Sequence, residues 1–235
     1  MKTYFITGVN GFIGIHWAKD LLSKGNTVLG IDNNSENIDL IKNYKKFFFF
    51  KGNILKYKKL KNLISRSDFI IHLASIAEPL KYMNKTKEVI DVTAIASINI
   101  INLCSKLNKT MFFTSTSEVY GKNPSLPFRE EDDRVLGSSS VKRWCYSSSK
   151  ALVEHYLEAT ANSNKKFKFK GVRLFNVYGS YLKGRVVPRF INCALKNKPI
   201  EVNGTGKQTR CFTYIKDAID AFNSIIKEKK CNNNF

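Results

Sequence analysis

The sequence predicts an α/β fold with a doubly wound parallel sheet. Short apolar runs alternate with longer stretches of helical periodicity, a glycine-rich turn follows the first apolar run, and polar side chains collect where the runs end. Strands that alternate with helices in this way are typical of parallel sheets with helices on both faces. The predicted strands are 4–7, 27–31, 46–51, 68–72, 110–114 and 167–175, and the predicted helices are about 12–24, 56–65, 84–107, 145–162, 186–196 and 215–228.

The first predicted strand is followed by a glycine-rich turn and an amphipathic helix. This order is the context that a dinucleotide-binding fingerprint requires, although the glycines here are spaced G-x-x-G-x-x-G. Gly8 allows a tight turn, Gly11 lets the backbone approach a pyrophosphate, and Gly14 permits close packing of the helix on the strand. Free N–H groups at the start of the helix would then face the phosphates. We therefore expect a Rossmann-type nucleotide site at this turn.

The second predicted strand ends at Asp32. A carboxylate at this position accepts hydrogen bonds from the adenosine ribose hydroxyls and repels a 2′-phosphate, so the predicted cofactor is NAD rather than NADP. The later strands are mostly continuous apolar runs, as expected for strands that are buried on both faces of a parallel sheet.

Tyr146 and Lys150 stand four residues apart, so they share one face of a predicted helix. An ammonium beside a phenol favours the phenolate and lowers the pKa of the phenol towards the range of a proton-transfer catalyst. The hydroxyl of Thr116, at the carboxyl end of a neighbouring strand, could hydrogen-bond the same substrate oxygen. Since ligands bind outside the carboxyl ends of the strands, we expect these side chains beside the nucleotide. The alternative is a surface Tyr and Lys that are merely helix neighbours.

The length of 235 residues suits one large domain, or one domain and part of another. The net charge of +20 comes largely from lysines that stand singly or in pairs, which does not favour a nucleic-acid partner. Five cysteines without a C-x-x-C motif and three scattered histidines indicate a reduced, cytoplasmic protein without a metal site. We expect no membrane span and no signal peptide, because no long uncharged apolar segment is evident and the first residues enter a strand directly.

Seven segments together make the chain resemble the extended short-chain dehydrogenase/reductases, specifically the NAD-dependent nucleotide-sugar epimerases and dehydratases. These segments are 7–14, 114–121, 123–128, 133–137, 143–150, 173–179 and 204–214, and the resemblance runs from residue 3 to about residue 235. It implies that Tyr146 takes the proton from the sugar C4 hydroxyl while Thr116 hydrogen-bonds that oxygen. Lys150 would hold the nicotinamide ribose, and hydride transfer from C4 to NAD would give a 4-keto sugar.

The fate of the keto sugar separates the subfamilies. Dehydratases that the chain resembles carry an Asp–Glu pair after the catalytic Thr, so Ser117 and Glu118 at these positions disfavour dehydration. Thr-Ser-Glu also occurs in UDP-glucuronate decarboxylases, whereas segments 122–124, 133–137 and 143–146 look more like the epimerases. We therefore expect a 4-epimerase of the UDP-glucose/UDP-galactose type first and a decarboxylase second. A truncated, weakly active protein that binds NAD or RNA is the alternative from another class.

The resemblance also assigns binding residues. Those assigned to NAD are Gly8, Asn10, Gly11, Phe12, Ile13, Gly14, Asp32, Asn33, Asn53, Ile54, Leu73, Ala74, Ala77, Thr114, Tyr146, Lys150 and Phe175. Those assigned to a nucleotide-diphosphate sugar are Ser117, Glu118, Asn176, Arg185, Val187, Arg189, Gln208 and Arg210. Arginine suits a diphosphate because its planar fork donates two hydrogen bonds. Two alternatives stay open: Arg189 as a solvated helix residue, and Arg210 as a partner of Asp217.

Three positions depart from the family pattern. Asn53 stands where a carboxylate usually holds the adenine amino group, although its amide oxygen could still accept. Ile15 stands where a small polar residue usually follows the pyrophosphate turn, and Asp91 replaces an asparagine. A buried carboxylate at position 91 would be unfavourable without a partner.

The predicted organisation is an NAD-binding domain over 1–175 and a partial substrate-binding lobe over 176–235, interleaved with it. Because members of the family run longer, we expect NAD to bind and the affinity for a sugar nucleotide to be impaired. The helices 84–107 and 145–162 carry apolar faces that match a dimer interface in the family, so a homodimer is expected.

Overall fold

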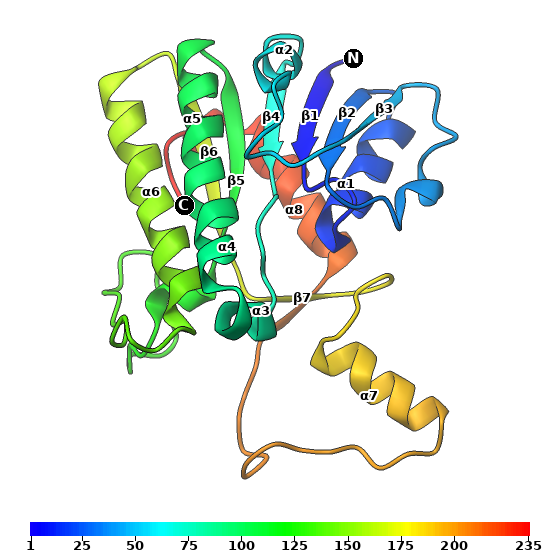
Figure 1. Ribbon diagram of the computed structural model, residues 1–235, viewed down its shortest axis with the longest axis vertical. Helices are drawn as coiled ribbons and strands as arrows, with labels where there is room; N and C mark the ends of the chain where they lie inside the picture. Colours follow the sequence, from blue (N-terminus) through cyan, green and yellow to red (C-terminus); the bar gives the residue numbers. More distant parts are fainter.

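The computed structural model describes residues 1–235 and has a six-stranded parallel sheet at its centre (Figure 1). The strands are β1 (Thr3–Thr7), β2 (Thr27–Asp32), β3 (Phe47–Lys51), β4 (Phe69–His72), β5 (Thr110–Thr116) and β6 (Lys168–Leu174). They lie in the order β3-β2-β1-β4-β5-β6, and every pairing is parallel. The predicted doubly wound parallel sheet is confirmed, and all six predicted strands are present.

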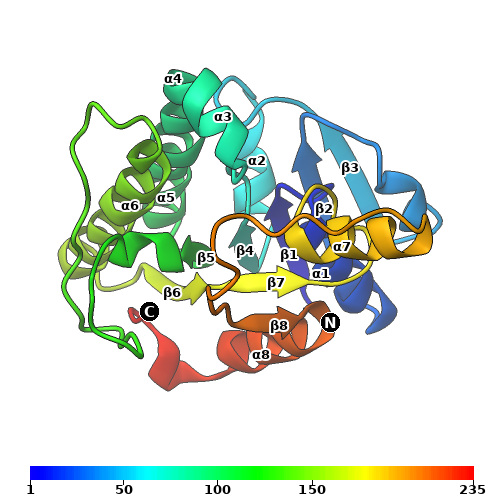
Figure 2. The same ribbon diagram turned by 90° about the horizontal axis from the view of Figure 1, so that it is seen from below.

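Helices cover both faces of this sheet (Figure 2). One layer contains α1 (Phe12–Ser23) and α8 (Ile215–Lys227), and the other contains α2 (Leu60–Ser65), α5 (Ala96–Lys106) and α6 (Trp144–Ser163). Short 3-10 turns are η1 (Ile38–Leu40), η3 (Ser117–Tyr120) and η4 (Lys229–Cys231). In β1, Phe5 packs towards the α5 layer and its neighbour Ile6 towards the α1 layer, both fully buried. Two-sided burial explains the apolar runs of the central strands, whereas β3 lies at the edge of the sheet, has no buried residue and leaves Phe48 50% exposed, so the prediction that this run is buried on both faces is wrong.

The helix predicted over 84–107 is present as a continuous helix over Thr86–Lys106 that contains a π-helical turn. A short helix, α3 (Pro79–Asn84), precedes it without having been predicted, and α4 (Thr86–Ile90) joins α5 through a π-helical turn, Asp91–Ile95. Asp91 forms a 2.6 Å ion pair with Lys87 and keeps a third of its side chain exposed. The departure at position 91 therefore has a partner, and the unfavourable burial does not arise.

The segment Thr86–Lys106 is long and apolar enough to cross a membrane by length and composition, contrary to the expectation that no such segment exists. In this fold its inner face packs on the sheet, where Ile100, Ile101 and Cys104 are fully buried. Ile90 and Ile95 on this segment and Leu152 on α6 are exposed, and the homodimer expected through these helices stays a prediction.

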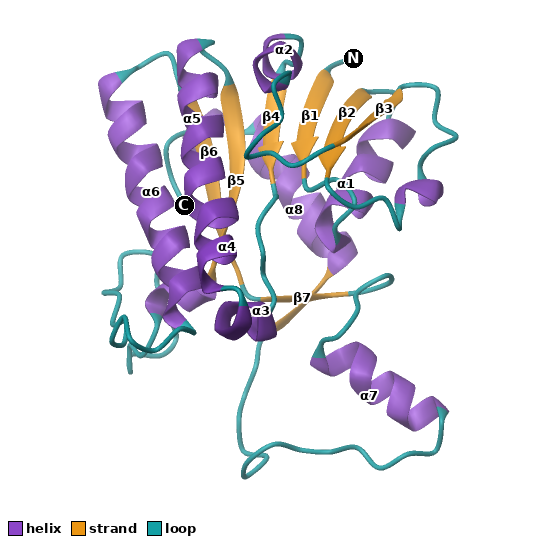
Figure 3. Ribbon diagram, viewed as in Figure 1, coloured by secondary structure: helices purple, strands orange, loops and turns teal.

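Residues 176–214 form an outlying part of the chain. β7 (Asn176–Tyr178) and β8 (Phe212–Tyr214) pair in a separate two-stranded sheet, and α7 (Val186–Leu195) lies between them in sequence. No residue of α7 is buried, and every residue from 194 to 214 is exposed. Figure 3 shows the long connection without regular structure between α7 and β8.

After this part the chain returns to the main sheet in α8. Trp17 Nε1 of α1 donates a 3.1 Å hydrogen bond to Asn223 Oδ1 of α8, and the rings of Trp17 and Phe222 have centroids 5.0 Å apart. The helix predicted at 215–228 therefore shares the core of the sheet domain, whereas it was expected to form part of the partial lobe.

Candidate active site

The glycine turn between β1 and α1 is closed by backbone contacts. Gly8 has a φ of +74°, a left-handed conformation that glycine adopts without strain, and a Cβ there would lie 2.8 Å from the Ala74 nitrogen. A Cβ on Gly14 would lie 2.2 Å from the Gly8 oxygen. Gly11 is exposed at the N-cap of α1, where the free N–H groups of the helix begin. The turn therefore fits a pyrophosphate at the start of α1.

Asp32 ends β2 beside this turn. Its two carboxylate oxygens accept backbone N–H bonds from Asn10 at 3.0 Å and Asn34 at 3.1 Å. Burial raises the pKa of the Asp32 carboxyl, and these backbone hydrogen bonds oppose the shift. Each carboxylate oxygen retains a further lone pair, so both ribose hydroxyls of NAD could still donate to it. These donors and acceptors fit the nucleotide half of NAD.

The other residues assigned to NAD lie along the carboxyl edge of the sheet or next to it. Ile54 and Thr114 are buried, Phe12, Ile13, Leu73, Ala74 and Ala77 are half-buried, and Asn33, Asn53 and Phe175 are exposed. The oxygen of Asn53 accepts the Leu55 N–H at 2.9 Å, so the atom predicted to bind the adenine amino group already has one partner. These individual assignments stay predictions.

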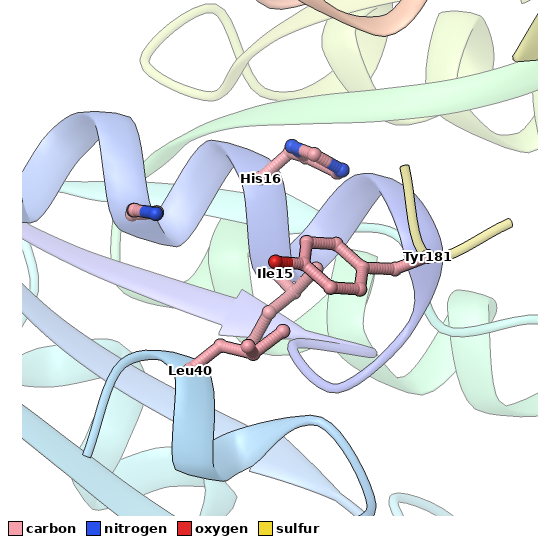
Figure 4. A pocket seen from close by; sticks show the side chains of 5 residues that line it. Ile15, His16, Leu40 and Tyr181 are labelled. Carbon is pink, nitrogen blue, oxygen red and sulfur yellow. The ribbon is translucent and has the colours of Figure 1, made fainter. Parts of the chain in front are cut away.

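Ile15 is packed by apolar and aromatic neighbours. With His16, Lys19, Leu40 and Tyr181 it lines a small cavity of about 40 Å³ (Figure 4). His16 anchors the facing loop through a 2.9 Å contact between its Nε2 and the Ser180 carbonyl oxygen. A large apolar residue at position 15 is therefore accommodated in the core of the molecule.

Lys150 lies on α6 with only 2 % of its surface exposed. Its Nζ donates a 2.6 Å hydrogen bond to the Thr114 carbonyl oxygen and lies 4.5 Å from the centre of the Phe113 ring. Burial lowers the pKa of Lys150 to about 7, and the charge of Glu154 opposes that shift. A lysine with this pKa can hold or release a proton near neutral pH.

Tyr146 is also buried, and the Lys150 Nζ lies 5.9 Å from the centre of its ring. Burial raises the pKa of the Tyr146 phenol, Glu118 raises it further, and hydrogen bonds with Ser75 and Thr116 oppose the rise. The expectation that Lys150 lowers this pKa is not met. Desolvation disfavours the phenolate of Tyr146 as well as the ammonium of Lys150. The structure does bring Tyr146, Lys150 and Thr116 together, as the sequence predicted.

Glu118, in η3, faces the same site. Its Oε2 is buried without a hydrogen-bond partner, and Nη2 of Arg143 lies 3.9 Å from it. Burial raises the pKa of the Glu118 carboxyl, while the charges of Arg143 and Arg185 oppose the shift. A carboxyl in this state is suited to general acid–base chemistry.

Two residues beside Tyr146, Ser75 and Tyr82, were not predicted. Tyr82 of α3 stacks on the Tyr146 ring with centroids 4.9 Å apart and planes 8° apart, and it is 1 % exposed. Together with Val89 these rings form a small apolar cluster that keeps water from the phenol. Ser75 comes shortly after the end of β4, and Thr116 ends the neighbouring strand β5. The position of Ser75 at the carboxyl edge of the sheet was the signal that could have identified this residue.

The residues assigned to a sugar nucleotide fall into two groups. Ser117 and Glu118 lie at the Tyr146 edge of the sheet, and Arg185 reaches it: Arg185 donates to the Ala77 carbonyl oxygen, and its charge acts on both Glu118 and Tyr146. Asn176 in β7 donates a 3.0 Å hydrogen bond to the Cys211 carbonyl oxygen.

The second group lies in the outlying part of the chain. Arg189 pairs with Glu201 at 2.5 Å, Gln208 donates to the Asn203 carbonyl oxygen at 2.6 Å, and Arg210 donates to the Thr209 carbonyl oxygen at 2.7 Å. Val187 lines a groove of about 350 Å³ between β7 and α7. The structure does not bring these four residues to Tyr146, and Arg210 does not pair with Asp217.

A dinucleotide turn and a buried Tyr–Lys pair at one edge of a parallel sheet define the class, an enzyme of Rossmann-type fold that uses a nicotinamide cofactor. Residues 4–235 match the model of the NAD dependent epimerase/dehydratase family. The chain belongs to this family and is an NAD-dependent enzyme.

Two curated relatives are more than a third identical to the chain. A UDP-N-acetyl-alpha-D-glucosaminuronate decarboxylase from Bacillus cytotoxicus is 37% identical over 97% of this chain and 72% of its own length. The bifunctional polymyxin resistance protein ArnA from Wigglesworthia glossinidia brevipalpis is 36% identical, and the match spans 99% of this chain and 38% of that protein.

A solved structure is similar throughout the chain. The UDP-glucuronic acid 4-epimerase from Bacillus cereus, in complex with UDP-glucuronic acid and NAD, has a TM-score of 0.87 and 26% identity and covers 97% of this chain and 74% of its own. The family resemblance, the fold and the NAD cofactor are thereby confirmed. The cytoplasmic compartment stays a prediction.

Proposed function

We propose that this chain oxidises the C4 hydroxyl of a nucleotide-diphosphate sugar and that a uronic acid sugar then loses carbon dioxide. The observation that carries the oxidation is the buried cluster of Tyr146, Lys150 and Thr116 beside the dinucleotide turn. The observation that favours the second step is Glu118 next to that cluster, whose buried Oε2 accepts no hydrogen bond and lies 3.9 Å from Nη2 of Arg143.

Tyr146 is the proton acceptor in this proposal. Ser75 and Thr116 lie beside the phenol oxygen, where a sugar hydroxyl would approach, and the stacked ring of Tyr82 restrains the Tyr146 ring. NAD, when bound, supplies the hydride acceptor and a positive ring charge that favours the phenolate. Lys150, with a pKa of about 7, favours the phenolate when protonated and can pass a proton onward when neutral.

Glu118 distinguishes the two fates of a 4-keto sugar. A 4-epimerisation needs only that the keto sugar turn over, so an acid–base carboxyl beside the phenol has no task in it. In a 4-keto uronic acid, loss of carbon dioxide leaves a carbanion at C5 that must gain a proton. Glu118, with its raised pKa, could donate that proton. The similarity to a uronic acid decarboxylase supports the same order of candidates.

The 4-epimerase expected first from the sequence is the second candidate. The likeness to the UDP-glucuronic acid 4-epimerase favours it, since that protein has the same fold over nearly all of this chain. A protein that acts only by binding NAD or RNA is not favoured, because the reacting side chains are present and buried together.

The proposal is tested by incubating the chain with NAD and, separately, UDP-glucuronate, UDP-N-acetylglucosaminuronate, UDP-glucose and UDP-galactose. Products are identified by mass spectrometry and NMR. We expect loss of carbon dioxide from a uronic acid sugar, and we expect Glu118→Gln to form NADH without releasing the pentose product at the normal rate. Interconversion of UDP-glucose and UDP-galactose, unaffected by Glu118→Gln, would establish the epimerase instead. Absence of both an NADH signal and any altered sugar with all four substrates would contradict the oxidation itself.

A further inference from the structure

A third polar residue stands in the same stripe of α6 as Tyr146 and Lys150. Glu154 follows Lys150 by four residues, as Lys150 follows Tyr146, so the three side chains lie along one face of the helix. Glu154 is only 4 % exposed. A carboxylate is almost never buried to this extent unless it is paired. Glu154 is therefore part of the interior behind the catalytic cluster.

Its partner is Arg173 of β6. The Arg173 guanidinium donates two parallel hydrogen bonds to the Glu154 carboxylate, Nε to Oε1 at 3.1 Å and Nη2 to Oε2 at 2.8 Å. The same guanidinium donates to the Tyr120 hydroxyl at 3.1 Å and to the Glu130 carbonyl oxygen, and it lies 5.1 Å from the centre of the Tyr120 ring. Tyr120 ends η3, which begins at Ser117. Arg173 thus joins the catalytic helix to the turn that carries Glu118.

A buried ion pair of this kind contributes little net stability, because desolvation of both charges offsets their attraction. Its position one helical turn from Lys150 gives it a different consequence. The negative charge of Glu154 favours the ammonium form of Lys150, against the effect of burial. Because Arg173 is paired with Glu154, its positive charge is expected to oppose that influence. Lys150 therefore lies in a field that two opposite charges set together.

Few other titratable groups face this part of the molecule. On α6 Lys150 faces Tyr146, and from β4 it faces His72, whose pKa burial lowers to about 3, so that His72 stays neutral. The groups presented by β5 are the Thr114 carbonyl oxygen and the Phe113 ring, neither of which titrates. Glu118 and Arg185 act on Tyr146. Glu154 is thus the anion whose charge acts on Lys150, and a substitution of Glu154 removes that charge without replacing any of these other groups.

We propose that Glu154 and Arg173 are a positioning pair that sets the protonation of Lys150 and so the pH range in which Tyr146 can exchange protons. Glu154 holds Lys150 in the ammonium form, and Arg173 limits that effect. This inference rests on the proposed oxidation for its purpose, although the protonation of Lys150 can be measured without any turnover.

The test compares variants of opposite expected effect. Glu154→Gln keeps the shape of the side chain and removes its charge, so Lys150 should titrate lower by about one pH unit or more. Arg173→Gln leaves the Glu154 charge unbalanced, so Lys150 should titrate higher. The double variant Glu154→Gln/Arg173→Gln should lie near the wild type. Glu158→Gln, one turn further along α6 and exposed, is the matched control and should leave the titration unchanged.

The measurement is the NMR titration of the full chain labelled with [¹³Cε]lysine, in which the Lys150 resonance is identified as the one missing from Lys150→Met. Circular dichroism shows whether each variant is folded. Shifts of opposite sign support the proposal. The proposal is overturned if Lys150 titrates at the same pH in folded Glu154→Gln and in the wild type. If Arg173→Gln does not fold, this comparison alone decides whether the proposal stands. Normal shifts without NADH formation from any UDP-sugar would contradict the proposed oxidation alone.

Discussion

The carboxyl edge of the main sheet and the outlying residues 176–214 differ in how firmly their polar side chains are held. At the sheet edge, Lys150 and Tyr146 are almost fully buried, and each has partners from other strands or loops. In the outlying part, Arg189 and Gln208 are exposed and form polar contacts only within their own segment. The difference indicates that the core preorganises the proposed reacting side chains, whereas it does not set the positions of Arg189 and Gln208, which are predicted to bind the sugar nucleotide.

The largest expected effect is that of Tyr146→Phe. Because the phenol oxygen is the proposed proton acceptor, NADH formation from the sugar should fall by about 10²–10⁴-fold, while NAD binding should be retained. Stopped-flow absorbance of NADH and calorimetric titration of NAD measure the two properties. Tyr214→Phe in the outlying part is the matched control and should leave the rate unchanged. Equal activity of Tyr146→Phe and wild type would show that the buried cluster is not the reacting centre.

Two isoleucines compare the stability of the two parts. Ile219 of α8 is 4 % exposed and belongs to the core that contains Trp17, so Ile219→Ala should lower the free energy of unfolding by about 2–5 kcal/mol. Ile191 of α7 is 55% exposed, and Ile191→Ala should change it by less than about 0.5 kcal/mol. Urea denaturation measures both. If Ile191→Ala lowered the free energy of unfolding as much as Ile219→Ala does, α7 would have to be packed against another surface in solution.

The pH dependence of stability tests the burial of Lys150. Its pKa is about 7 in the folded chain and near 10.5 when solvated, so the unfolded chain binds more protons between these values. The free energy of unfolding should therefore gain from Lys150 as the pH rises from about 7 towards 10.5, by up to about 1.4 kcal/mol per unit. Lys150→Met should lack this contribution. Parallel pH profiles for the two proteins would place the ammonium in contact with solvent.

Among the charged side chains, the smallest expected effect concerns the exposed pair of Arg189 and Glu201. Both side chains are more than half exposed, so Glu201→Gln should alter the free energy of unfolding by about 1 kcal/mol or less, and added salt should remove the difference. Chemical denaturation at low and high salt measures it. Glu154→Gln removes a charge whose partner Arg173 has only 14% of its side chain exposed, so Glu201→Gln should be clearly the milder of the two variants. The reverse order would contradict the contrast between the two parts.

Local sequence patterns predicted the helices and strands better than the packing of these elements on one another. The six predicted runs each gave a strand, and in the central strands β1 and β4 burial on both faces accounts for the unbroken apolar sequence. The same patterns could not show that α8 returns to pack on α1, since an amphipathic helix does not specify its partner. Nor did they show the π-helical turn at Asp91–Ile95, because the apolar periodicity on either side of it is that of an ordinary helix.

The candidate site was predictable where its residues stand at fixed spacing. The four-residue step from Tyr146 to Lys150 and the end of the strand at Thr116 were sufficient to place all three together. Tyr82 and Arg173 were not identified, because ring stacking and a buried ion pair join residues that no local spacing relates. The pKa of Tyr146 was expected to fall because the neighbouring charge was considered without the desolvation that outweighs it.

The two tryptophans of this chain stand at two separate places, one in the core beneath α8 and one at the start of α6. Trp17 of α1 contacts Phe112 of β5 and Phe222 of α8. Trp144, two residues before Tyr146, begins α6 and packs against Gly137. Single substitutions of each by Phe would give two proteins with one fluorophore apiece, one reporting the docking of α8 on the core and the other reporting events at the mouth of the active site. The chain thus carries its own optical reporters for folding and for ligand binding.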